Sequence, residues 1–129
     1  MTGVQTCALP ILASALINAN KLGQAAQTLK VAQQLQPGRW DAYILEGMIA
    51  ARTHDLDLAL DSLRKGIELN PKYGPSHAAL GWVLAAQGRL TAARDEYRLA
   101  LSNSSMLSAD NKALVLRAIA NLNEKLPAK

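Results

Sequence analysis

The sequence predicts an all-α fold made of repeated helix pairs, and this prediction rests on composition and on an internal period. Half of the 129 residues are hydrophobic, yet only 4% are aromatic and Phe is absent. Ala and Leu therefore carry the apolar content, and both residues favour helices over strands. Within the predicted helices, apolar residues recur at the i, i+3, i+4 and i+7 spacing of an amphipathic helix.

A 34-residue period runs through most of the chain. When the sequence is shifted by one period, small and apolar positions coincide in six sets: Ala25/Ala59/Ala93, Leu22/Leu56/Leu90, Leu29/Leu63/Tyr97, Ala32/Gly66/Ala100, Ala13/Gly47/Gly81 and Pro37/Pro71. A period of this length indicates a helix–turn–helix unit that buries its apolar face against its neighbours. Small residues at matching positions let the helices approach one another closely.

The period, together with residues that end or cap helices, defines the expected helices. We expect them at residues 8–20, 23–36, 40–53, 56–69, 74–87, 90–103 and 108–126. Pro37 and Pro71 end two of them, because proline cannot donate the next helical hydrogen bond. Ser108 is the expected N-cap of the last helix, which we expect to pack on the helix at 90–103. That helix is either a terminal cap or the first helix of a fourth pair.

The repeated pattern resembles the tetratricopeptide repeat (TPR). Residues 74–105 carry it at Leu80, Gly81, Leu84, Gly88, Ala93, Tyr97 and Ala100. Residues 40–73 carry it at Tyr43, Gly47, Ala59, Leu63, Gly66 and Pro71, and residues 6–39 in their second helix only, at Ala25, Leu29, Ala32 and Pro37. The resemblance implies a TPR-like α-solenoid of three helix–turn–helix repeats, at 12–39, 40–73 and 74–107, followed by a C-terminal capping helix and tail at 108–129.

The first eleven residues, MTGVQTCALPI, resemble the translation of a short-read sequencing adaptor. We therefore expect residues 1–11, including Cys7, to be an artefact without a functional role. On this interpretation the chain is a bacterial fragment, and its native protein continues upstream with further repeats or domains. The compartment, cytoplasmic or bacterial periplasmic, then stays open. The alternative is a genuine N-terminus.

Charge, hydropathy and motifs argue against several classes of function. The net charge of +4 is dispersed, without a run of five like charges that would suggest a nucleic-acid arm. No apolar stretch reaches the roughly 18 residues that span a bilayer. His54 falls in a turn and His77 at a packing position, in different repeats and without a nearby carboxylate of suitable spacing, so we expect both to have structural roles. Without a nucleophile elbow, phosphate loop or metal-ligand cluster, the sequence predicts neither an enzyme nor a cofactor or metal.

In TPR proteins the first helix of each repeat lines a concave groove. The resemblance implies a groove lined by Ser14, Ile17 and Asn18 from the first repeat, Asp41, Ile44, Met48, Ala51 and Arg52 from the second, and Pro75, Ala78, Trp82, Ala85 and Ala86 from the third. TPR grooves that grip a peptide C-terminal carboxylate use Lys, Arg and Asn. This groove offers only Arg52 and Asn18, so we argue against a carboxylate clamp.

Our hypothesis is that Ile44, Met48 and Trp82 form an apolar anchor site for a helical or extended partner segment. The alternative makes Trp82 part of the core between repeats. Glu46, where Leu is usual, either reaches water from an edge position or anchors a partner's cation. We expect a protein–protein interaction scaffold that binds a protein or peptide and has no catalysis of its own. The alternative function is a recruitment or oligomerisation tail of a larger enzyme whose catalytic domain lies upstream.

Overall fold

The computed structural model describes residues 3–103, 105 and 107–126, with side chains from Leu9 onward, and these residues form seven helices and no strand. The helices are α1 (Gly3–Asn18), α2 (Leu22–Leu35), α3 (Trp40–Arg52), α4 (Leu56–Leu69), α5 (Gly74–Ala86), α6 (Leu90–Ser102) and α7 (Ala109–Lys125). The bounds of α2 to α7 agree with the predicted ones to within about a residue. α1 begins earlier than predicted, and it runs through the segment that resembles an adaptor. The Cys7 side chain lies outside the described part.

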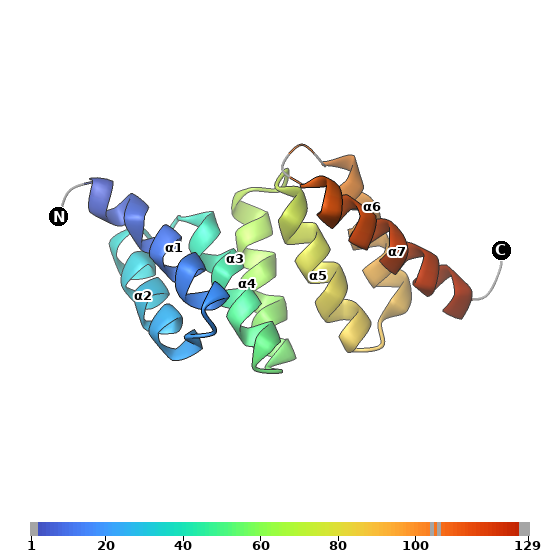
Figure 1. The fold of residues 1–129 in the computed structure, drawn as a ribbon, viewed down its shortest axis with the longest axis horizontal. Coiled ribbons are helices and arrows are strands. Elements are labelled where there is room, and N and C mark those ends of the chain that lie inside the picture. Colours follow the sequence, from blue (N-terminus) through green and yellow to red (C-terminus); the bar gives the residue numbers. More distant parts are fainter. Residues whose placement is uncertain (1–2, 104, 106, 127–129) are drawn as a thin grey trace. The chain divides into compact units, whose positions relative to one another are not determined.

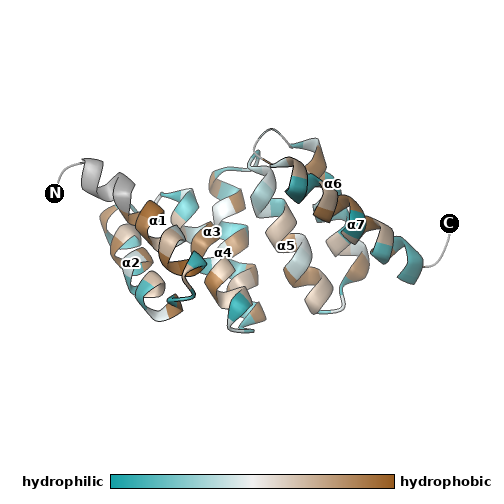
Figure 2. Cartoon of the chain, viewed as in Figure 1, coloured by the Kyte–Doolittle hydropathy of each residue, from teal (hydrophilic) through white to brown (hydrophobic). Residues whose placement is uncertain are grey.

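The helices fall into two compact units (Figure 1). Unit 1, Met1–Asn70, holds α1 to α4, and unit 2, Pro71–Lys129, holds α5 to α7. In unit 1, α1 pairs with α2 and α3 pairs with α4, while α3 also contacts α1 and α2. In unit 2, α5 pairs with α6, and α7 packs on α6 as the sequence predicts. Hydropathy alternates along the helices, so that each helix has apolar residues to bury (Figure 2).

Glycines set the close approach of the paired helices. A Cβ atom added at Gly47 of α3 would lie 2.6 Å from Cγ of Leu63 in α4, and one added at Gly66 of α4 would overlap the side chain of Ile44. In unit 2, a Cβ atom at Gly81 would lie 3.0 Å from the ring of Tyr97. The small residues of the repeated pattern therefore mark positions where one helix receives a large side chain of its partner.

The turn inside each helix pair also repeats. Asn20, His54 and Gly88 are spaced one period apart and have φ angles of 60°, 62° and 81°. This left-handed conformation is easy for Gly, tolerable for Asn and strained for most other side chains. His54 is thus a turn residue, in agreement with its predicted place between helices.

Two side chains cap helix N-termini. Asp55 accepts a hydrogen bond from the backbone N–H of Leu58 at the start of α4, and Ser108 accepts one from Asn111 at the start of α7. The cap at Ser108 confirms the prediction. Val115 and Leu122 of α7 are buried, whereas Leu114 and Leu116 on the flanks of the helix are exposed.

Candidate partner-binding surface

α5 differs from the other helices of its unit because it contains no Asp, Glu, Lys or Arg. It begins with Gly74, which packs against the backbone carbonyl groups of Ala100 and Asn103 at the end of α6. Pro75 follows in the first turn, where its missing N–H leaves no helical bond unmade. Leu80, Gly81, Val83 and Leu84 are buried, together with the polar residues Ser76 and His77.

The other side of α5 is apolar and open to solvent. Trp82 is 49% exposed. Ala79, Trp82 and Ala86 follow one another at helical spacing, and Ala78, Ala85 and, in the first turn, Pro75 extend the same apolar surface. We call these six residues the α5 face. The exposure of Trp82 argues against the alternative that it is buried core between repeats.

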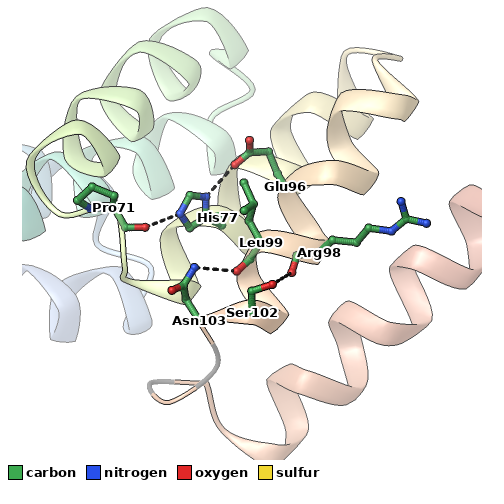
Figure 3. Close-up of polar contacts among 7 residues, drawn as sticks. All are labelled: Pro71, His77, Glu96, Arg98, Leu99, Ser102 and Asn103. Carbon is green, nitrogen blue, oxygen red and sulfur yellow. Dashed lines mark hydrogen bonds and ion pairs between the residues drawn. The ribbon is translucent and has the colours of Figure 1, made fainter.

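His77 lies on the buried side of α5, where both ring nitrogens face oxygen atoms (Figure 3). Its Nδ1 lies 2.9 Å from Oε1 of Glu96 in α6, and its Nε2 lies 2.7 Å from the backbone oxygen of Pro71. The spacing of residues in the sequence did not indicate this carboxylate beside His77. His77 and Glu96 are far apart along the chain, and the packing of α5 on α6 brings them together.

Two of the apolar groove candidates of unit 1 are core residues. Ile17 is buried in a cluster with Ala13, Ala25, Leu29, Ala32, Ala42 and Ile49. Ile44 is only 3% exposed, and its side chain fills the space above Gly66. The predicted anchor role of Ile44 is therefore corrected, because the missing side chain at Gly66 draws Ile44 into the core. Met48, Ser14 and Ala51 are half-buried.

The polar groove candidates of unit 1 have contacts within the chain. Asp41 receives two hydrogen bonds from Arg39, with Nε–Oδ1 and Nη2–Oδ2 distances of 2.8 and 3.2 Å. Arg52 donates from Nη1 to the carbonyl oxygen of Ile17 at 2.8 Å. This bond places a cation at the C-terminal end of α1, where the helix dipole favours positive charge. Asn18 is exposed.

Glu46 has a partner within the chain that neither of its predicted roles included. It is half-buried, and its Oε1 accepts a hydrogen bond of 2.7 Å from the hydroxyl of Ser62 in α4. The carboxylate is thus held by the partner helix of its own pair, a contact that offsets the cost of its partial burial. Glu96 is the equivalent of Ser62 one period later, so the same position in α4 and α6 binds a polar side chain of the preceding helix.

Metal-binding clusters and membrane-spanning helices are absent from the described residues. These residues contain no group of three or more His, Cys, Asp or Glu that could hold a metal ion. None of their helices is long and apolar enough to cross a membrane. Burial raises the pKa of the Tyr97 phenol above its ordinary value of 10.0.

Known proteins share this arrangement of helices. Residues 41–73, which span α3 and α4, match the family model of the tetratricopeptide repeat. Comparison with curated protein sequences gives no significant match. Among solved structures, the type III secretion chaperone SycD of Yersinia enterocolitica, in complex with a peptide of the translocator YopD, superposes with a TM-score of 0.82 at 18% identity, over 96% of each chain.

Two further TPR structures are similar. The first TPR of Spaghetti (RPAP3), bound to the HSP90 peptide SRMEEVD, has a TM-score of 0.84 at 12% identity and covers 99% of this chain and 98% of its own. The chain has a tetratricopeptide-repeat fold. The TPR2B domain of yeast Sti1, in its pHsp70 complex, has the same TM-score at 10% identity, over 96% of this chain and all of its own. At these identities the likeness concerns the fold, and it confirms the predicted all-α TPR solenoid class.

Proposed function

We propose that this TPR chain is a protein-interaction scaffold and that the α5 face, centred on Trp82, binds an apolar segment of a protein partner. The TPR fold typically serves as a non-catalytic protein-binding module. SycD and the Spaghetti TPR are both described in complex with peptides, and TPR2B with pHsp70, which supports a binding function for the same fold here.

The observation that carries the proposal is a half-exposed tryptophan on a helix without charged residues. A partner that covers Trp82 buries a large aromatic surface without removing water from a charged group of α5. Tryptophan is also among the residues most often found at the energetic centre of protein interfaces. The small side chains beside it let a helical or extended backbone approach α5 closely.

The same composition predicts what the partner lacks. The α5 face has no Lys, Arg or Asn that could hold the terminal carboxylate of a peptide. We therefore propose that the bound segment is internal and apolar. Met48, Ser14, Asn18 and the remaining donors of Arg52 in unit 1 are candidates for separate contacts. Ile17 and Ile44 are omitted from the proposed surface because their side chains are buried.

The test starts from a displayed library of random peptides selected on the wild-type chain. Enriched peptides are then titrated by fluorescence anisotropy against wild type and Trp82→Ala. Loss of a central aromatic contact is expected to weaken binding by roughly thirtyfold, a factor typical of a hot spot. Amidation of the peptide C-terminus is expected to leave the dissociation constant unchanged.

Leu114→Ala in α7 is the matched control, because it also removes an exposed apolar side chain but lies on another helix. It is expected to bind the enriched peptides like wild type. Circular dichroism melts show whether both variants keep the fold. Equal affinity of wild type and a folded Trp82→Ala for every enriched peptide, or selection of no peptide at all, would sink the proposed site.

A further inference from the structure

The two oxygen atoms that face the His77 ring indicate how many protons the ring carries. A backbone carbonyl oxygen only accepts hydrogen bonds, so the 2.7 Å contact with Pro71 needs an N–H at Nε2. An ionised carboxylate also only accepts, so the 2.9 Å contact with Glu96 needs a second N–H, at Nδ1. Both contacts are made at once only by a doubly protonated, cationic ring.

The preceding repeat makes the first contact without the second. Tyr43 lies one period before His77, and its hydroxyl donates to the backbone oxygen of Pro37, which lies one period before Pro71. The bond to the proline carbonyl is therefore a repeated feature that one proton satisfies. The second N–H, which faces Glu96, has no counterpart at Tyr43, because a tyrosine hydroxyl carries one proton.

We propose that His77 is a proton-dependent clamp that joins α5 to α6 and to the start of unit 2. In its cationic form the ring binds Glu96 and the Pro71 carbonyl together. When the ring loses its Nδ1 proton, the nitrogen lone pair faces the carboxylate oxygen, and the contact with α6 becomes repulsive. The clamp is independent of the partner-binding function proposed above.

The other titratable and charged groups near the clamp do not take the place of His77 as the partner of Glu96. Within the described part of unit 2, the ion pair of Glu96 is with His77. Tyr97, the next residue of α6, packs on Gly81 and stays neutral near neutral pH because burial raises its pKa. Arg98 points away from the ring (Figure 3). The segment before α5 supplies Lys72, which is exposed, and Tyr73.

Burial of the ring opposes its charge, since His77 is 6% exposed. The Glu96 carboxylate and the Pro71 carbonyl oxygen act in the other direction, because each accepts a hydrogen bond that favours the cation. By linkage, the clamp contributes fully in mildly acidic solution, and its contribution is lost as the pH rises.

The test measures urea unfolding of wild type, His77→Tyr and Glu96→Gln at about pH 6 and about pH 8.5. His77→Tyr copies Tyr43, so it keeps a donor for Pro71 and removes the titrating ring. From the lower to the higher pH, the unfolding constant of wild type is expected to rise roughly fivefold more than that of His77→Tyr. His54 is present in all three proteins, so its titration cancels from the comparison.

Glu96→Gln tests the partner of the second proton. A glutamine amide can donate to a neutral Nδ1, so this variant is expected to lose the extra pH dependence of wild type. Nitrogen-15 NMR of the wild-type imidazoles gives a readout that needs no variant. Both His77 nitrogens are expected to carry protons at about pH 6, with Nδ1 deprotonated at about pH 8.5.

Two results would overturn the clamp. One is a parallel pH dependence of unfolding in wild type and His77→Tyr. The other is a His77 ring that NMR finds neutral, with its proton on Nε2, over the whole pH range. If His77→Tyr does not fold, the NMR measurement on wild type decides alone.

Discussion

Single residues control how closely the helices of a pair approach. At Gly66, the absent side chain leaves room for Ile44, while the backbone oxygen of Trp40 closes the same space from the side. Gly23 lies in α2 with no atom within 4 Å of an added Cβ atom. The same substitution at these two helical glycines therefore separates packing from helix propensity.

We expect Gly66→Ala to lower the free energy of unfolding by about 1–3 kcal/mol, because Ile44 and α3 must shift to admit the methyl group. Gly23→Ala is expected to raise it by up to about 1 kcal/mol, because alanine favours the helix and meets no neighbour. Urea titrations followed by circular dichroism measure both. A Gly66→Ala protein as stable as Gly23→Ala would show that close packing of α3 on α4 does not need the glycine.

The residues that sequence reasoning placed wrongly share one physical cause, which is the packing of one helix against another. The resemblance assigned Ile44 to a groove, but its side chain fills the space at Gly66 and is buried. The pairing of His77 with Glu96 depends on how α5 packs on α6. In contrast, Arg39 and Asp41 are near neighbours in the chain, so their ion pair was accessible from the sequence.

At the scale of helices, the sequence predicts most of the structure because local signals determine where a helix ends. The N-cap at Ser108, the helix ends before Pro37 and Pro71, and the turn at His54 lie where the sequence predicts them. α1 is the exception. Its start at Gly3 lies earlier than the predicted start at residue 8.

Packing of α5 on α6 also determines an alkaline limit of stability. Tyr97 is buried against Gly81, and burial raises its pKa above 10.0, so the folded state favours the neutral phenol. A raised pKa means that this contribution is complete below the unfolded value and is lost as the pH rises through the folded one. The loss therefore begins above about pH 10.

We expect wild type to lose more unfolding free energy than Tyr97→Phe between about pH 9 and about pH 11.5, because phenylalanine fills the site without a proton to lose. The two proteins are expected to be of similar stability at neutral pH. Urea unfolding at each pH provides the comparison, and Tyr43 and Tyr73 are common to both chains. Equal losses in the two proteins would mean that ionisation of Tyr97 does not limit the alkaline range.

For the molecule as a whole, the repeat period predicts three equal repeats, whereas the structure groups the helices unequally. The first two pairs form unit 1, and the third pair with α7 forms unit 2. Each unit has buried residues of its own, from Ala13 to Leu63 in the first and from Ser76 to Leu122 in the second. Local stability is therefore expected to differ between helices according to how much of each one is covered.

α1 is the helix for which we expect the lowest local stability. Ile11 and Leu12 are 72% and 50% exposed, and Pro10 inside the helix cannot donate a backbone hydrogen bond. Its C-terminal end is held by the Ile17–Arg52 hydrogen bond and by the burial of Ala13 and Ile17 in a cluster with residues of α2 and α3. Amide hydrogen exchange read by mass spectrometry is therefore expected to be faster across residues 12–22 than across 74–103, where α5 and α6 bury matching faces. Slower exchange at 12–22 than at 74–103 would contradict this order and would mean that contacts beyond those of α2 and α3 protect α1.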